Sequence, residues 1–426
     1  MTEAEKKVDG FINRHILVFG FVAVSVFAFM IRYSFFPQRS LDWQLYLVKW
    51  IEELASHPGL SGIGKNIGEY NVPYMLFLNI AARTPFNDLY EVKLFSIVFD
   101  YLLAGAAALL VYRNTGAKDT GMSLAAYAAV LMTPVSFIDS AWWSQCDSIY
   151  SFGVVLSLYY LVKEKYGWSW FWFGIAFSFK LQAIFFLPVL LIYYLASKKM
   201  SIFNSLIAAA VFCVMLIPAL IAGRGLKDTF GIYVSQAGLY NSLTLNTPNI
   251  HCIIEGDTIS MFQPAAIFLT AGVLAAAGCV FIKRGLHSAY AYITLAFWTV
   301  TVCVFLLPSM HERYTYLSCI MAIIWAAVGR KRYDLIIAVT VNAVSIRSWM
   351  AYMFHKEINF TVLAFVNLAV IVIVTARLFS LREEPAAETA ESENEKKETP
   401  EIETVVDTAK EKTEKTKNKK AATAKA

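Results

Sequence analysis

The chain has 426 residues, of which 58% are hydrophobic and 15% aromatic. Its 37 basic and 32 acidic residues are unevenly placed, because residues 381–426 hold 10 of the former and 12 of the latter. The rest of the chain therefore carries charge at about half the density of a soluble domain, which excludes an ordinary soluble protein and indicates a polytopic membrane protein. The net charge of +5 gives no indication of a nucleic-acid partner, because the basic residues lie in short loops between apolar runs.

Apolar runs that are long enough, or nearly long enough, to cross a bilayer recur along residues 1–380. They predict an all-α fold with about twelve transmembrane helices, at residues 15–36, 94–112, 122–137, 149–162, 168–178, 181–195, 202–222, 261–282, 289–307, 314–328, 335–354 and 360–378. Basic clusters fall at every second junction between these runs. The positive-inside rule places those junctions, and both termini, in the cytoplasm.

Residues 37–93 form a long first external loop that is too polar and too broken to cross a bilayer. Ser40 can cap a helix that begins at the next residue. The helical spacing of the apolar residues that follow predicts an interfacial helix on the outer leaflet, with an apolar face made of Leu41, Leu45, Val48 and Ile51. Trp43 and Trp50 would lie at headgroup depth. Residues 381–426 are Lys/Glu-rich and nearly free of aromatics, which predicts a disordered cytoplasmic tail.

Two interpretations of Asp42 follow from its place near the start of this helix. A carboxylate in a first turn interacts favourably with the helix dipole, which is a common surface role and the one that the local sequence favours. The same carboxylate could instead be a general base held at the membrane surface. Glu52, Glu53 and Glu69 are expected to be surface charges.

Polar residues also interrupt the external end of the hairpin at residues 136–150. Trp143 and Asp147 are four residues apart and can share a helix face, and Gln145 lies between them. A hydrated loop would explain these residues, but polar groups near membrane depth usually line a cavity. Cys146 and Cys252 fall in external loops and could pair, although two candidates give only a weak disulfide signal.

Cationic residues occupy two further external positions. Lys180 lies between two apolar runs, where it could snorkel to the headgroups or bind an anionic phosphate. Arg313, in the sequence PSMHERYTY at residues 308–316, could pair locally with Glu312 or fork onto phosphate or carboxylate oxygens. His311 and Tyr314 would share a face of the helix that starts here. Neither a nucleotide-binding nor a metal-binding motif accompanies these residues.

Six stretches carry a resemblance to a known family. They occur in the order SLDWQLYLVKW, GEYNVPYMLFL, KLFSIVFDYLLA, WWSQCDSIYSFG, SFKLQAIFFLPVLL and LPSMHERYTYL. The series resembles the membrane glycosyltransferases of the GT-C type. More narrowly, it resembles bacterial proteins related to the second mannosyltransferase of glycosylphosphatidylinositol anchor synthesis, and it is more weakly similar to dolichyl-phosphate-glucose-dependent glucosyltransferases. The resemblance covers roughly residues 41–316.

The resemblance implies a hexosyltransferase that moves mannose or glucose from a polyprenyl phosphate to an acceptor hydroxyl of a cell-envelope glycan or glycolipid, with inversion, at the outer face of the cell membrane. It maps the catalytic base onto Asp42. The residues that it places near the donor phosphate and sugar are Lys180, Gln182, His311, Arg313 and Tyr314. Further candidates for the pocket are Tyr70, Trp143, Gln145 and Asp147. No second acidic residue lies close to Asp42 in the sequence, which leaves open whether Glu52 or Asp147 assists and whether a divalent metal is required.

The general chemistry of glycosyl transfer supports this assignment independently of the resemblance. A glycosyl phosphate already carries a good leaving group, so one carboxylate that deprotonates the acceptor hydroxyl on the opposite face gives inversion. Arg313 and Lys180 would stabilise the growing phosphate charge. A prenyl chain needs an apolar lateral groove, which residues 168–179 or their neighbours could supply.

Two other functions fit the same composition. A transporter or flippase for a lipid-linked or small polar substrate should show related halves and charges near the middle of its spans. Here the charges gather at one face and the halves look unrelated. An envelope polymer ligase or polymerase would be expected to carry a large loop between late spans, and the sequence has none.

Overall fold

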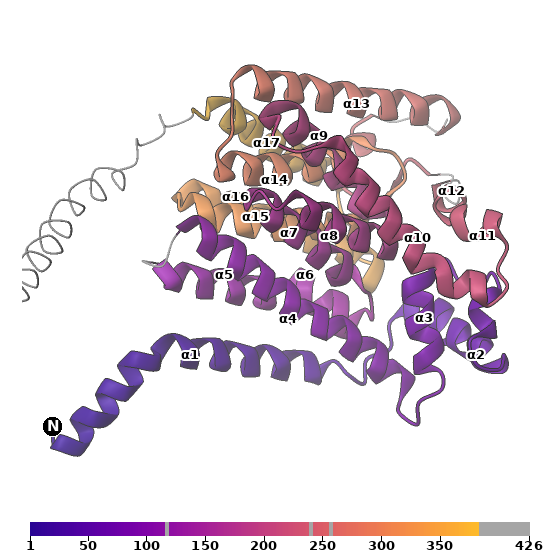
Figure 1. Ribbon diagram of the computed structural model, residues 1–426, viewed down its shortest axis with the longest axis horizontal. Coiled ribbons are helices and arrows are strands. Elements are labelled where there is room, and N and C mark those ends of the chain that lie inside the picture. Colours follow the sequence, from indigo (N-terminus) through magenta and orange to yellow (C-terminus); the bar gives the residue numbers. More distant parts are fainter. Residues whose placement is uncertain (116–118, 238–241, 255–258, 383–426) are drawn as a thin grey trace, which may run out of the picture. The chain divides into compact units, whose positions relative to one another are not determined.

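The computed structural model describes residues 1–115, 119–237, 242–254 and 259–382. These residues are almost entirely helical, which confirms the all-α prediction, and residues Met1–Leu381 form one compact unit. The predicted disordered tail lies outside the described residues except for its first two positions. Figure 1 shows the arrangement of the helices.

The α-helices are α1 (Glu3–Ser34), α2 (Val48–Ser56), α3 (Val72–Ala81), α4 (Asp88–Thr115), α5 (Thr120–Met132), α6 (Pro134–Phe137), α7 (Asp147–Val162), α8 (Tyr166–Phe179), α9 (Leu187–Ser197), α10 (Ser205–Ile221), α11 (Leu226–Phe230), α12 (Ile232–Ala237), α13 (Ile259–Lys283), α14 (Ala289–Leu306), α15 (Tyr316–Gly329), α16 (Arg332–Phe354) and α17 (Phe360–Ser380). Two π-helical segments are η1 (Trp43–Leu47) and η4 (Ile138–Trp142). The 3₁₀ segments are η2 (Ser61–Gly64), η5 (Leu181–Phe186), η6 (Ile202–Asn204), η7 (Ile250–Cys252) and η8 (Glu312–Thr315). Strand β1 (Thr244–Leu245) pairs in parallel with β2 (Met310–His311).

Within the part of the chain that the structure describes, seven helices are long and apolar enough to cross a membrane, namely α1, α4, η6 with α10, α13, α14, α16 and α17. The α5 helix and the α6–η4 segment would give an eighth span if they are counted together, although they are bent by 46°. All twelve predicted apolar runs are helical over most of their length, but α7, α8, α9 and α15 are shorter than the other spans. The chain therefore has the character of a multi-pass membrane protein.

Helix α7 lies in the centre of the bundle, where α8 and α4 pack against it. Small residues allow the close approach to α8: a Cβ atom on Gly153 would come within 2.9 Å of the Ala176 side chain. The Ser157 and Ser169 hydroxyls lie 3.2 Å apart across the same interface. Membrane helices commonly pack through such small residues. This packing fixes the N-terminus of α7, where Asp147 lies.

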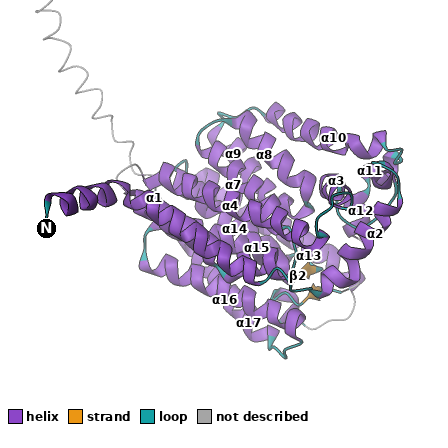
Figure 2. Cartoon of the chain, turned by 90° about the horizontal axis from the view of Figure 1, so that it is seen from below, coloured by secondary structure: helices purple, strands orange, loops and turns teal. Residues whose placement is uncertain are grey.

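The short helices α2, α3, α11 and α12 gather at one end of the bundle (Figure 1), and the β1–β2 pair lies at that end too (Figure 2). The predicted cap is confirmed, because the Ser40 hydroxyl accepts a hydrogen bond from the Trp43 amide at 3.2 Å.

The residues of the predicted apolar face divide between the surface and the protein interior, where Val48 and Ile51 pack in or against one buried cluster. The buried residues are Trp43, Leu47, Ile51 and Leu54, whereas Leu41 and Leu45 are exposed. The π-helical turn at η1 is wider than an α-turn, so it rotates the following residues away from simple 3.6-residue spacing. Trp43 consequently packs inside a cluster with α3 and α4 residues.

Two buried cations fasten the end of α1 to α4. The Arg32 Nε donates to an Asp100 carboxylate oxygen at 2.8 Å, and neither side chain is exposed. Lys93 is also fully buried and donates to the main-chain carbonyls of Phe35, Phe36 and Gln38. The chain that leads from α1 to Asp42 is therefore held in place. None of these three charged residues was predicted from the sequence to have a structural role.

We expect the Asp100→Asn substitution to destabilise the fold by about 3–5 kcal/mol, because it leaves the Arg32 charge buried without its partner. Thermal unfolding in detergent measures the effect. The control is Glu164→Gln, which breaks an ion pair with Lys199 whose side chains are 53% and 61% exposed, so its Tm should stay close to that of the wild type. Equal losses of stability in the two variants would contradict this account.

Candidate active site

Segments that are far apart in the sequence meet at the end of the bundle that carries the short helices. Asp42 precedes η1, and Gln145 lies between η4 and α7. Asp147 is the first residue of α7, Lys180 joins α8 to η5, and Arg313 lies in η8. These five residues form one connected group of hydrogen bonds and ion pairs. We call this group the polar cluster.

The Asp42 carboxylate points into the protein and is only 7% exposed. One of its oxygens accepts a hydrogen bond from the Tyr352 hydroxyl at 2.6 Å, and the other accepts one from the Gln145 amide. The Arg313 guanidinium lies 3.8 Å from the second oxygen. The interpretation of Asp42 as a surface charge at a helix start is therefore wrong, since its carboxylate is enclosed by donors from three other elements.

Gln145 links the carboxylate to the cations. Its carbonyl oxygen accepts hydrogen bonds from the Tyr70 hydroxyl at 2.6 Å and from Arg313 Nη1 at 2.7 Å, while its amide nitrogen donates to Asp42. Burial raises the pKa of Tyr70 well above its usual range. Tyr70 therefore stays a neutral donor, and Gln145 uses both ends of its amide to set the distance between Asp42 and Arg313.

Asp147 is fully buried and pairs with both cations of the polar cluster. Lys180 Nζ lies 2.7 Å from one carboxylate oxygen, and Arg313 Nη1 lies 3.2 Å from the other. Burial opposes the charge of Arg313, but the nearby Tyr70, Asp147 and Asp42 together raise the pKa of its guanidinium. The predicted snorkelling of Lys180 is wrong, because its ammonium turns inward to a buried carboxylate and is 8% exposed as a residue.

Aromatic rings surround the two cations. The Arg313 guanidinium lies over the Trp143 ring at 5.3 Å, and the Lys180 ammonium lies 5.5 Å from the Tyr70 ring and 6.0 Å from the Tyr150 ring. These distances allow cation–π attraction, which strengthens when the site is shielded from water. The Trp143 ring in turn stacks on Tyr352, with centroids 5.4 Å apart.

Irregular backbone brings these side chains to one place. The π-helical segment η1 begins directly after Asp42, and η4 ends directly before Trp143. Such segments are frequent at functional sites. Ser144 has a left-handed φ of 65°, which costs energy for a residue that is not glycine. The expected shared helix face of Trp143 and Asp147 is therefore wrong, because the helix is broken between them. Both nevertheless contact Arg313.

His311, Tyr314 and Gln182 lie beside the polar cluster. His311 is fixed by the β1–β2 pairing, and its ring contacts that of Tyr314 at 5.4 Å between centroids. Its Nδ1 lies 3.9 Å from a Glu312 carboxylate oxygen, so Glu312 pairs with His311, and the expected local pair with Arg313 is replaced by the pairs to Asp42 and Asp147. Gln182 is 7% exposed, interacts with Tyr314, and has a carbonyl oxygen that accepts no hydrogen bond from the described residues.

The remaining acidic residues of the first loop lie on the surface. Glu52, Glu53 and Glu69 are all exposed, as expected. Partial burial of the Glu69 carboxyl group raises its pKa, and the interaction with His311 counteracts this shift. Within the ranges that the structure describes, no three His, Cys, Asp or Glu residues are grouped so that they could hold a metal ion.

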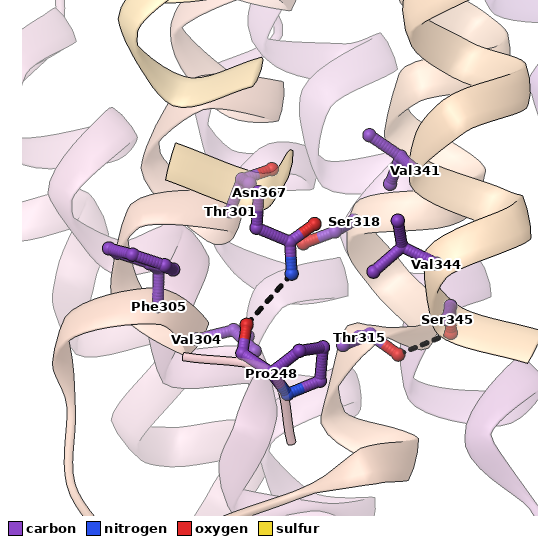
Figure 3. A pocket seen from close by; sticks show the side chains of 10 residues that line it. All are labelled: Pro248, Thr301, Val304, Phe305, Thr315, Ser318, Val341, Val344, Ser345 and Asn367. Atoms are coloured by element: carbon purple, nitrogen blue, oxygen red, sulfur yellow. Dashed lines mark hydrogen bonds between the residues drawn. The ribbon is translucent and has the colours of Figure 1, made fainter. Parts of the chain in front are cut away.

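The described residues enclose two cavities that no residue of the polar cluster lines. The smaller has a volume of about 20 Å³, which is room for roughly one water molecule, and is bordered by Thr315, the last residue of η8 (Figure 3). Hydrogen bonds from Asn367 to the Pro248 carbonyl and between Thr315 and Ser345 border it. It is too small for a substrate, and these bonds instead help to fix the segment that carries Arg313.

The larger cavity, of about 380 Å³, lies between α13, α14 and α17 and is lined almost entirely by apolar side chains. It extends from Leu306 and Ile250, next to the β1–β2 end, to Trp298 and Phe379. We call it the apolar cavity. Its position differs from that of residues 168–179, which were expected to form a groove, because α8 packs against α7 and α10.

Some features of the site escaped sequence analysis. Tyr352 and Trp349 lie near the end of a predicted span and were treated as part of it, although their three-residue spacing puts both on one helix face. Asp139 is one of the polar residues that interrupt the hairpin at residues 136–150, and its role was missed. Its carboxylate accepts a hydrogen bond from the Asp147 amide at 3.1 Å. The weakly indicated disulfide is absent, because Cys146 and Cys252 are both free.

Cys146, between Gln145 and Asp147, reports on whether the site is closed. Burial raises the pKa of its thiol to about 12, so the reactive thiolate is scarce at neutral pH and increases only as the pH approaches that value. With the other five cysteines replaced, we expect negligible maleimide labelling of the folded protein at pH 7–8 and rapid labelling after denaturation. A cysteine placed at the exposed Ser56 should react readily. Fast labelling of Cys146 in the folded protein would contradict a closed site.

Comparison of the chain with models of known protein families and with curated proteins gives no match. Its function is therefore inferred from the chemistry of the polar cluster and of the apolar cavity.

Proposed function

We propose that this protein is an integral membrane hexosyltransferase of the GT-C type, which transfers mannose or glucose from a polyprenyl phosphate to a hydroxyl of a cell-envelope glycan or glycolipid. The observation that carries the proposal is the polar cluster itself. A shielded carboxylate, Asp42, is held within 3.8 Å of a guanidinium that belongs to a pair of cations suited to phosphate. The resemblance to enzymes of this type supports the same assignment of residues.

In this proposal Asp42 is the general base. Its two oxygens are held by Tyr352 and Gln145, and the fixed orientation of a base is a large part of its catalytic effect. It takes the proton of the acceptor hydroxyl while that oxygen attacks the anomeric carbon from the face opposite the phosphate. The phosphate leaves with the bonding electrons, and the sugar is transferred with inverted configuration.

Arg313 and Lys180 bind the donor phosphate. Arg313 Nε makes no hydrogen bond to the described residues, and Lys180 Nζ makes one, to Asp147. Both groups therefore keep donors for phosphate oxygens, and charge-assisted bonds of this kind are strong in a shielded site. Gln182, His311 and Tyr314 are close enough to the cluster to contact the sugar or phosphate.

The apolar cavity supports a lipid-linked donor. Its lining of Val273, Val302, Leu306, Leu368 and Phe379 side chains matches the chemistry of isoprene units. Its end at Leu306 lies close in the sequence to His311. In a membrane enzyme a prenyl chain placed there would put its phosphate near the end of the bundle that holds the polar cluster.

The proposed topology follows from the positive-inside rule. About twelve spans, both termini in the cytoplasm and the polar cluster on the outer side form a consistent set. A lipid-carried donor suits an outward-facing site, because nucleotide sugars are not supplied there.

A transporter or flippase remains the alternative, and the buried Arg32–Asp100 pair is the feature that favours it. Arg32, however, lies in the last turn of α1, two residues before its end at Ser34. The pair thus joins the last turn of α1 to the central part of α4. It holds in place the chain that leads to Asp42, which explains its burial without a transport site. The enzyme is the better account.

We expect Asp42→Asn to reduce sugar transfer by roughly 100-fold or more, because an amide cannot accept the acceptor's proton. Membranes supplied with radiolabelled polyprenyl-phosphate mannose or glucose give the measurement. The control, Glu53→Gln, removes an exposed carboxylate of the same loop and should leave transfer unchanged. Normal turnover by the Asp42→Asn variant would refute the assignment of the base.

Arg313→Ala should raise the KM for the donor more than the KM for the acceptor, because the lost guanidinium contacts phosphate and not the acceptor. The measurement varies each substrate separately at saturating concentrations of the other. Lys49→Ala, at a cation elsewhere in the first loop, is the control. An unchanged donor KM in the Arg313 variant would rule out its phosphate role.

A further inference from the structure

Asp147 already pairs with the two cations that are proposed to bind phosphate, although binding a phosphate does not require such a carboxylate. Its carboxylate bonds to Lys180 on one oxygen and to Arg313 on the other, and it is fully buried. Asp42 lies near the same guanidinium. The two cations are thus balanced by these two carboxylates before any substrate enters, and the buried Asp139 carboxyl lies beside them as a third acidic group. A phosphate would therefore enter a site with no net positive charge.

An anion that enters a shielded site without net compensation loses much of its hydration energy. It must therefore compete for the cations with a resident carboxylate. Asp42 has two hydrogen bonds that do not depend on the cations, from Tyr352 and Gln145. The side-chain ion pairs of Asp147 are with the cations themselves, and at shorter distances than the 3.8 Å between Arg313 and Asp42.

We propose that Asp147 is an internal counter-anion that occupies the two cations in the empty site and is exchanged for the donor phosphate. The proposal rests on the function above, and it makes Asp147 a positioning residue. In the empty site its two oxygens hold Lys180 and Arg313 close together, as the oxygens of a phosphate would. When the phosphate binds, the cations turn part of their interaction from Asp147 to the phosphate oxygens. When the phosphate product leaves, Asp147 recovers both cations and favours its release.

If Asp147 is exchanged for phosphate, its removal should strengthen phosphate binding, whereas removal of a residue that only supports its neighbours should weaken it. Asp147→Asn should lower the Tm of the empty protein, because two buried cations lose their partner. It should also bind inorganic phosphate more tightly than the wild type does, with a Kd lower by roughly tenfold. The phosphate-induced rise in Tm should be larger than in the wild type, since ligand binding stabilises the folded state.

The experiment measures thermal unfolding and phosphate binding of the full chain in detergent, with inorganic phosphate and a short-chain isoprenyl phosphate as probes. The matched control is Asp100→Asn, which also removes a buried carboxylate from an arginine but lies outside the polar cluster. It should lower the Tm and leave the Kd for phosphate at the wild-type value. Recovery of the folded Asp147→Asn protein only in the presence of phosphate would support the exchange.

Three results would overturn the exchange: equal or weaker phosphate binding by Asp147→Asn, the same gain in affinity in Asp100→Asn, or failure to recover folded Asp147→Asn even with phosphate. Sugar transfer by the wild type is measured separately. A wild type that transfers no sugar while Asp147→Asn gains affinity would refute the glycosyltransferase and leave the exchange standing. If the wild type transfers sugar but Asp147→Asn shows no gain in phosphate affinity, the exchange is refuted and the glycosyltransferase stands.

Discussion

The buried carboxylate of Asp147, between Lys180 and Arg313, is the interaction on which the rest of the site depends. It ties the start of α7 to the link after α8 and to the segment before α15. No member of this triad can leave alone without stranding a charge inside the protein, which is costly. Through Gln145 the same triad fixes the distance from Arg313 to Asp42, so that the proposed base and the proposed phosphate ligands form one unit.

Such convergence requires a backbone that departs from regular helix at chosen points. The π-turns at η1 and η4 and the left-handed Ser144 turn side chains toward the polar cluster that regular helices would direct elsewhere. The packing of α7 against α4 and α8 in the core stabilises the fold enough to offset the conformational energy of these irregular segments. The bundle therefore acts as a rigid support, and the irregular segments at its end carry the chemistry.

Sequence alone predicted the helical class and the positions of the helices, because apolar runs in a membrane protein have few alternatives. It also placed Lys180, Arg313, Gln145 and Asp147 among the candidates. It could not predict which groups pair: Tyr352, 310 residues from Asp42, was indistinguishable from an aromatic at the end of a span. The burial of Trp43 and Leu47 after Ser40 was not predicted, because a π-turn leaves no signal in hydrophobic spacing. Arg32 and Asp100 were overlooked because each looked like an isolated charge in an apolar run.

The anomeric configuration of the transferred sugar tests the central claim most directly. Purified protein in lipid nanodiscs is given radiolabelled polyprenyl-phosphate mannose or glucose together with an extract of envelope lipids and glycans, and the product linkage is determined by digestion with linkage-specific glycosidases. The account predicts label from one of the two donors in a product whose anomeric configuration is the opposite of the donor's. A product with retained configuration, or no transfer from either donor across fractionated acceptors, would contradict it.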